Sequence, residues 1–136
     1  MNYWLLGVSI FHFIASLLHL SCVVFGGKMF RFLGAGEYIA TLSDKGHWYP
    51  PFIATVIAIM LAGFGVYALS AVGVVRALPY PKLILIGIGA IFVLRAVAFP
   101  LIRPLFPENS LTFWLTSSAI CLFVGLAHWI GVYHLK

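Results

Sequence analysis

The sequence predicts an all-α fold, an integral membrane four-helix bundle with an amphipathic, partly helical first loop. The first observation behind this prediction is composition, because 63% of the 136 residues are hydrophobic and only 8% are charged. A soluble domain of this length needs a charged surface that this chain cannot supply. The second observation is four apolar segments, each near the roughly 20 residues that cross a hydrocarbon layer as a helix. They are Tyr3–Phe25, Phe52–Val75, Leu83–Phe99 and Leu111–Leu135.

The four segments are predicted as helices because barrel strands run to about 10 residues and alternate in polarity. The connections between them are too short for a soluble domain, so residues 1–136 are expected to form one integral membrane domain. The first segment is expected to be retained, since "MNYW" carries no Lys or Arg and no cleavage pattern follows. Cys22 and Cys121 lie within or beside apolar segments and are expected to act as small apolar residues.

Two of the loops carry local structural signals. The first loop, "GGKMFRFLGAGEYIATLSDKGHWYPP", is apolar enough to predict one or two short helices on the membrane surface, broken around "GAG". The third loop, "PLIRPLFPENS", contains three prolines, which predict that no helix forms there. Ser110 at its end is a predicted cap for the fourth segment.

Lines of small and polar side chains run along three of the four segments. In the first segment the line consists of Ser9, His12, Ser16 and His19. In the fourth it consists of Ser118, Cys121, Gly125 and His128, and the second segment offers Ala54, Ala58 and Ala62. Steps of three and four residues put each line on one helix face, and such residues are typical of close helix contacts in membranes. We therefore expect the lines of the first and fourth segments to face each other or a common interior.

Helical rise predicts which polar side chains lie at similar depth. His12 and His128 fall within roughly 5 Å of each other along the membrane normal. His19 and Arg95 share a depth closer to the first loop, and Glu37 in the "GAGEY" turn is the nearest acid. The sequence therefore predicts a ligand-binding site beneath the first loop, formed by His19, Arg95 and Glu37, in which Glu37 neutralises Arg95.

Each of these features also has a purely structural explanation. The histidines and serines can be helix-contact residues with no ligand. Arg95 lies five residues before Pro100, so its side chain can extend to the interface instead of staying at depth. These alternatives stay open at the level of the sequence.

The motifs of known chemistry are missing from the sequence. No acid lies within an apolar segment, and no catalytic triad order, HExxH, CxxC or phosphate-binding glycine loop is present. His12 and His19 are about 10 Å apart along the helix axis and cannot share a metal ion. We expect no catalytic residues, no metal site and no resident cofactor. The alternative is haem b, for which His12 and His128 are the one sensible axial pair.

The net charge of +5 does not indicate a nucleic-acid-binding protein, because eight basic residues are scattered over several loops without a basic stripe. Membrane lipids are the expected partners of this charge. The basic residues are divided almost evenly between the two ends of the segments, and the compact "RALPYPK" loop slightly favours cytoplasmic termini.

Three stretches, "FLGAGEY", "YALSAVG" and "SSAICL", resemble ones in small uncharacterised four-span proteins of bacterial inner membranes. The resemblance covers most of the chain and implies a multi-pass protein of that membrane. That group brings no known activity, so no functional residue can be carried over.

Two functions are compatible with these features. The first is a non-enzymatic membrane protein that binds a small lipophilic or anionic molecule, or packs on a membrane partner or a second copy of itself. The alternative is a redox protein that holds b-type haem between His12 and His128 and exchanges electrons with quinone. The sequence does not decide whether the protein is an enzyme, and it favours a protein that is not. A small multidrug transporter is disfavoured, because no segment contains an acidic residue.

Overall fold

The computed structural model describes all 136 residues as a chain of helices without strands. The elements are α1 (Tyr3–Phe25), α2 (Gly27–Phe32), α3 (Glu37–Asp44), α4 (Tyr49–Ala71), α5 (Pro81–Val97), α6 (Phe99–Ile102), the 3-10 turn η1 (Arg103–Leu105) and α7 (Leu111–Tyr133). The predicted all-α class is confirmed. The four predicted apolar helices correspond to α1, α4, α5 and α7.

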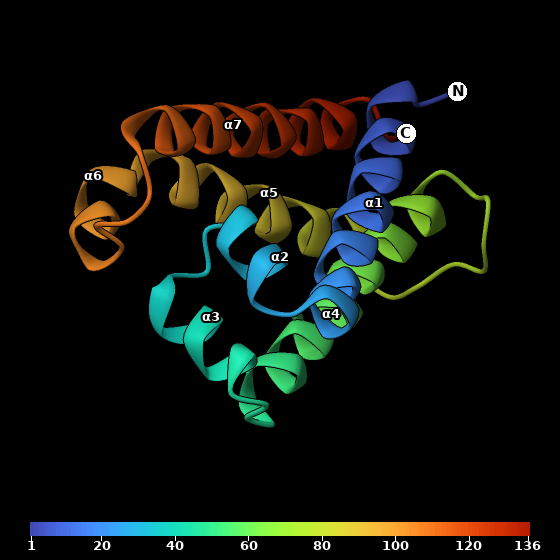
Figure 1. The fold of residues 1–136 in the computed structure, drawn as a ribbon. Coiled ribbons are helices and arrows are strands. Elements are labelled where there is room, and N and C mark those ends of the chain that lie inside the picture. The colour runs from blue at the N-terminus through green and yellow to red at the C-terminus, as the bar shows by residue number, and fades with distance from the viewer.

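The long helices form two antiparallel pairs, α1 with α4 and α5 with α7 (Figure 1). The pairs are joined where α1 packs on α7 and α4 packs on α5. The two termini lie close together at one end (Figure 1), and the Asn2 side-chain amide donates to the Gly131 carbonyl oxygen at 2.7 Å. Helices α2 and α3 cover the other end of the α1–α4 pair.

Three of the helices, α1, α4 and α7, are each 23 residues long and apolar enough to cross a membrane. Helix α5 is shorter, at 17 residues, and together with the α6–η1 segment it forms a fourth candidate that bends by 59°. The structure therefore contains three or four candidate spans. Helix α4 begins three residues before the predicted start, because Pro50 and Pro51 fit into its first turn.

The prediction that prolines exclude a helix from the third loop is wrong for its first half. Pro100 lies in the first turn of α6 and Pro104 in the first turn of η1. Proline is tolerated there because the missing N–H would have no intrahelical partner at that position. The predicted cap of α7 is confirmed, since the Ser110 hydroxyl oxygen accepts from the Phe113 amide at 3.0 Å.

The first loop folds as the two short helices α2 and α3, as predicted. The chain breaks between them at Gly34 and Gly36, whose φ angles of 75° and 98° favour glycine. Phe30 of α2 and Ala40 of α3 are buried against α1 and α4. The Asn109 amide donates to the Gly34 carbonyl oxygen at 3.1 Å, so this break also contacts the third loop.

Large apolar side chains cover the outside of the molecule. Only 28 of the 136 residues are buried, while aliphatic and aromatic side chains stay exposed on every long helix. Examples are Leu17 at 66%, Ile59 at 68%, Leu94 at 66% and Phe123 at 65% exposure. An apolar surface of this extent indicates a nonpolar surrounding or a large partner.

Glycines allow α5 and α7 to approach closely. A Cβ atom on Gly125 would lie 2.8 Å from the Gly89 carbonyl oxygen and 2.6 Å from a Val93 methyl group. Beside this contact, the Trp129 indole N–H donates to the Ile86 carbonyl oxygen at 3.1 Å. Contacts of this kind hold helix pairs together in membranes.

We expect Gly125→Ala to destabilise the protein by about 1–3 kcal/mol, because the new methyl group meets the backbone of α5. Thermal unfolding in detergent, followed by circular dichroism, measures the effect. Gly87→Ala is the matched control, since a Cβ there meets no atom within 4 Å, and its effect should stay within about 0.5 kcal/mol. Equal losses from both variants would contradict the close contact.

Candidate functional site

The serines on α1 bind α4. The Ser9 hydroxyl donates to the Gly65 carbonyl oxygen at 3.1 Å, and the Ser16 hydroxyl donates to the Ala58 carbonyl oxygen at 2.7 Å. Ala58 is buried, as expected for a close-packed helix edge. The polar lines of α1 and α7 therefore do not face each other along their length.

His12 of α1 and His128 of α7 are the exception and meet directly. Their Nε2 atoms are 3.1 Å apart, and both side chains are fully buried. The rings of Phe11, Phe64 and Phe92 surround the pair, with Phe92 stacked on His128. The depth estimate from the sequence thus paired these two histidines correctly.

The neighbours of the pair define where its protons lie. A carbonyl oxygen can only accept, so His128 Nδ1 is the donor to the Val124 carbonyl oxygen at 2.8 Å. For two neutral rings, His128 Nε2 is then the acceptor and His12 Nε2 the donor. His12 Nδ1 is left as a buried acceptor without a partner. The pair is therefore a directional hydrogen bond from α1 to α7.

Haem does not fit between these two imidazoles as they are arranged. Bonds from imidazole to a metal of about 2 Å place two axial nitrogens roughly 4 Å apart, with the ring of the haem between them. Here the two nitrogens touch each other at 3.1 Å, and the phenylalanine rings fill the surroundings. Helices α1 and α7 would have to move apart to admit the group.

His19 lies at an apolar cavity of about 370 Å³ between α1, α4 and the α2–α3 segment. Its walls include Cys22, Phe30, Ile39, Tyr49, Ile53 and Ile57. His19 Nδ1 donates to the Ala15 carbonyl oxygen at 2.8 Å. In the neutral ring, Nε2 is therefore the acceptor that remains for a ligand.

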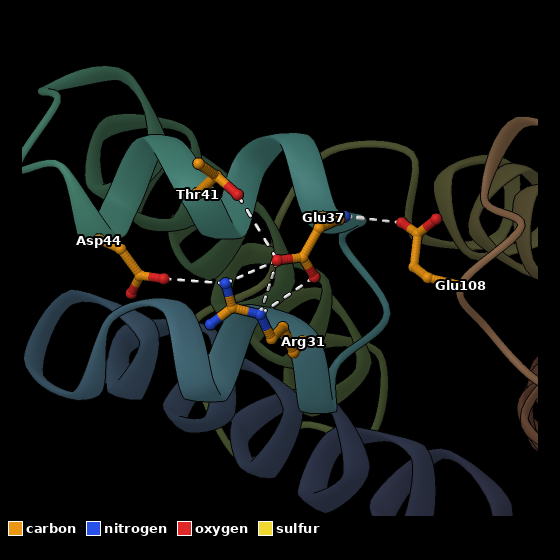
Figure 2. A network of polar contacts seen from close by, with 5 residues as sticks. All are labelled: Arg31, Glu37, Thr41, Asp44 and Glu108. Atoms are coloured by element: carbon orange, nitrogen blue, oxygen red, sulfur yellow. Dashed lines mark hydrogen bonds and ion pairs between the residues drawn. The ribbon is translucent and has the colours of Figure 1, made fainter.

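Glu37 pairs with Arg31 and not with Arg95, which corrects the predicted pairing. The Arg31 Nη2 atom lies 2.7 Å from a Glu37 carboxylate oxygen and 2.8 Å from one of Asp44 (Figure 2). Arg31 lies on α2, directly beside α3, so it reaches Glu37 without leaving the first loop. In turn, the Glu37 amide donates to Glu108 at 2.6 Å, which ties α3 to the third loop (Figure 2).

The Arg31 guanidinium holds the pKa of Glu37 below its ordinary value through hydrogen bonding and charge. In return, the carboxylates of Glu37 and Asp44 raise the pKa of Arg31. All three side chains are exposed, so water screens these pairs and they contribute little to overall stability. Their role is to position α3 on α2.

Arg95 lies apart from both His19 and Glu37 and binds only neutral groups. Its guanidinium donates to the Ser118 hydroxyl at 3.1 Å and to the Ser117 hydroxyl at 3.0 Å. Its Cζ atom lies 5.1 Å from the centre of the Trp114 ring. The predicted single site of His19, Arg95 and Glu37 is therefore divided over three places. The reason is that Arg95 is hydrogen-bonded to serines of α7, whereas Arg31 holds Glu37.

Sequence reasoning missed two partners. Arg31 was not predicted as the partner of Glu37, although it lies six residues before Glu37, across a single helix break. Ser117 was overlooked because only its neighbour Ser118 follows the polar line of α7. Counting the charges within the first loop could have found Arg31, whereas no pattern in the sequence indicated Ser117.

The sequence matches no protein-family model, no curated protein and no solved structure. Within the chain, no group of three or more His, Cys, Asp or Glu side chains is arranged to hold a metal ion. The functional argument therefore depends on the geometry of the chain itself.

The hydrogen bond between His12 and His128 predicts coupling between the two positions. Each single change to Leu leaves one buried nitrogen unpaired and should destabilise the protein by about 1–3 kcal/mol. The double variant should lose less than the sum, with a coupling on the order of 1 kcal/mol. Unfolding of all four proteins in detergent measures the cycle. Strictly additive losses would show that the two rings do not interact.

The lowered pKa of Glu37 predicts that acid loosens α3. Because the folded pKa lies below the unfolded one, the contribution is complete above the ordinary glutamate pKa, about 4.3. It is lost as pH falls through the lower folded value. Hydrogen-exchange protection factors of α3 should therefore fall on acidification, while those of α7 persist.

Arg31→Gln is the matched control for this pH effect. It removes the cause of the shift, so it should lower the protection of α3 near neutral pH and flatten the dependence on acid. An unchanged loss of protection in Arg31→Gln would contradict the role of the ion pair.

Proposed function

We propose that this chain is a non-enzymatic, multi-pass protein of the bacterial inner membrane that binds a small lipophilic molecule beneath α2 and α3. The observation that carries the proposal is the apolar cavity with His19 on its wall. Cavities of this size, largely apolar and with few polar groups, are typical of small-molecule sites.

The outer surface supports a membrane location. Apolar side chains cover all four long helices and three of these helices have mean hydropathy values of 1.7 to 2.3. The bend after α5 supports a fourth span that ends at the interface. Lipids are accordingly the proposed surroundings, and a second copy or another membrane protein could cover part of the same surface.

The chemistry of the cavity favours a lipophilic ligand over an anionic one. Nine of its ten lining residues are hydrophobic, and neither Arg95 nor Arg31 is among them. His19 Nε2 offers a hydrogen-bond acceptor, so a matching ligand carries a donor such as a hydroxyl group on an apolar body. We therefore propose a lipophilic alcohol or phenol as the ligand class.

A matched pair of probes tests this proposal. 1-Naphthol and naphthalene share an apolar double ring and differ in one hydroxyl group. At about pH 8, the wild-type protein should bind naphthol roughly 2–10-fold more tightly, which corresponds to one net hydrogen bond. His19→Leu should remove this preference while both probes still bind. Equilibrium dialysis against detergent micelles measures the affinities.

Two variants serve as controls for the dialysis. His47→Leu changes an exposed histidine outside the cavity and should keep the preference for naphthol. Ile57→Trp fills the cavity and should lower the affinity for both probes. An equal preference for naphthol in the wild type and in His19→Leu would refute the proposed site.

A further inference from the structure

Arg95 is a cation without a counter-ion in the protein. A guanidinium stays charged in proteins, and at membrane depth it requires water, an acid or an anion. Arg95 is half-buried and hydrogen-bonds only to serine hydroxyl groups. The chain has three acidic residues, and all three belong to the network around Arg31 and Glu37 (Figure 2). None of these carboxylates forms an ion pair with Arg95 in the structure.

A second, independent observation lies beside Arg95. The Trp114 side chain is 3% exposed, and its indole N–H is buried without a hydrogen-bond partner. An unpaired buried donor is costly, so this group needs an acceptor. The Arg95 guanidinium lies over the same ring, with its Cζ atom 5.1 Å from the ring centre. An unneutralised cation and an unpaired donor thus meet in one place.

The hydroxyl groups at this place add one more free donor. Ser117 donates its proton to the Trp114 carbonyl oxygen at 3.3 Å. Ser118 accepts from Arg95, and its own proton has no partner within the chain. Beside Arg95, the Ser118 hydroxyl and the Trp114 indole N–H are thus both donors without a partner, which is the arrangement that an oxyanion requires.

The position of these residues matches the level of lipid headgroups. Arg95 lies in the last turn of α5 and Trp114 in the first turn of α7. Both are at the end where the helix pair meets the third loop. Arginine and tryptophan at helix ends are typical of the membrane interface, where phosphate groups lie.

We propose that Arg95, Ser118 and the indole N–H of Trp114 form a binding site for a phosphate group. The planar guanidinium can bind two phosphate oxygens, and the indole N–H and the Ser118 hydroxyl each bind one more. The phosphate belongs either to a lipid headgroup or to a free phosphate ion. This site shares no residue with the cavity at His19 and does not depend on the function proposed for it.

Binding to the full chain in detergent tests the site. The probes are phosphatidylglycerol, an uncharged diacylglycerol with the same chains, and inorganic phosphate, each titrated and followed by native mass spectrometry and thermal unfolding. We expect the wild-type protein to bind phosphatidylglycerol more tightly than diacylglycerol. Arg95→Gln should lower the affinity for phosphatidylglycerol by about tenfold or more. Arg103→Gln, which changes an exposed arginine in η1, is the control, and its affinity for phosphatidylglycerol should stay within about twofold of the wild-type value.

Trp114→Phe separates ligand binding from a structural role. It keeps the ring under Arg95 but removes the N–H, so affinity for the phosphate probe should fall roughly 2–10-fold. Without the probe, the variant should unfold at the same or a higher temperature, because an unpaired donor is gone. A lower unfolding temperature together with unchanged affinity would overturn the assignment of the indole N–H.

The remaining outcomes decide the source of the phosphate and the existence of the site. Stabilisation by inorganic phosphate that is lost in Arg95→Gln identifies a free anion, whereas a response to phosphatidylglycerol alone identifies a lipid headgroup. Equal binding of phosphatidylglycerol and diacylglycerol by the wild type would overturn the proposal. If Arg95→Gln does not fold, Arg95→Lys replaces it, and loss of the planar fork should still weaken binding several-fold.

Discussion

The two helix pairs meet at one buried polar contact, the hydrogen bond between the imidazoles of His12 and His128. A buried nitrogen in an apolar surrounding has no water to bind, so each ring needs the other to be in register. Further along the same contact, Gly131 leaves room for the Leu5 side chain, because a Cβ there would lie 2.7 Å from it. Polar pairing and a small residue together therefore set how α1 crosses α7.

The other polar groups of the long helices follow the same constraint. Ser9 and Ser16 donate to carbonyl oxygens of α4, and Arg95 donates to hydroxyl groups of α7. Each contact joins two long helices that follow one another in the chain. Two buried nitrogens have no hydrogen-bond partner, His12 Nδ1 and Trp114 Nε1. The first is enclosed by phenylalanine rings, whereas the second adjoins a cation, which is why only the second indicates a ligand.

The helices could be predicted from the sequence within a few residues, because long apolar segments and capping residues act locally. The His12–His128 contact could be predicted as well, since depth along a helix follows from residue number. The sequence places Arg31 in the same loop as Glu37, but the choice between Arg31 and Arg95 also depends on how α3 folds back on α2. The prediction that prolines exclude a helix from the third loop failed for a related reason. The effect of a proline depends on whether it lies in the first turn of a helix or within the helix.

If the chain lies in a bilayer, as proposed, the short α5 affects the lipids around it. At a rise of about 1.5 Å per residue, its 17 residues span roughly 26 Å, against about 35 Å for each of the 23-residue helices. A hydrocarbon core of about 30 Å is thus too thick for α5 and too thin for its neighbours. Hydrophobic mismatch of this kind is relieved by tilt of the long helices and by local thinning beside the short one. In the proposed membrane location, thinning on the α5 side would lower the headgroups toward the bend after α5, so the lipid layer itself would adapt to the shape of the protein.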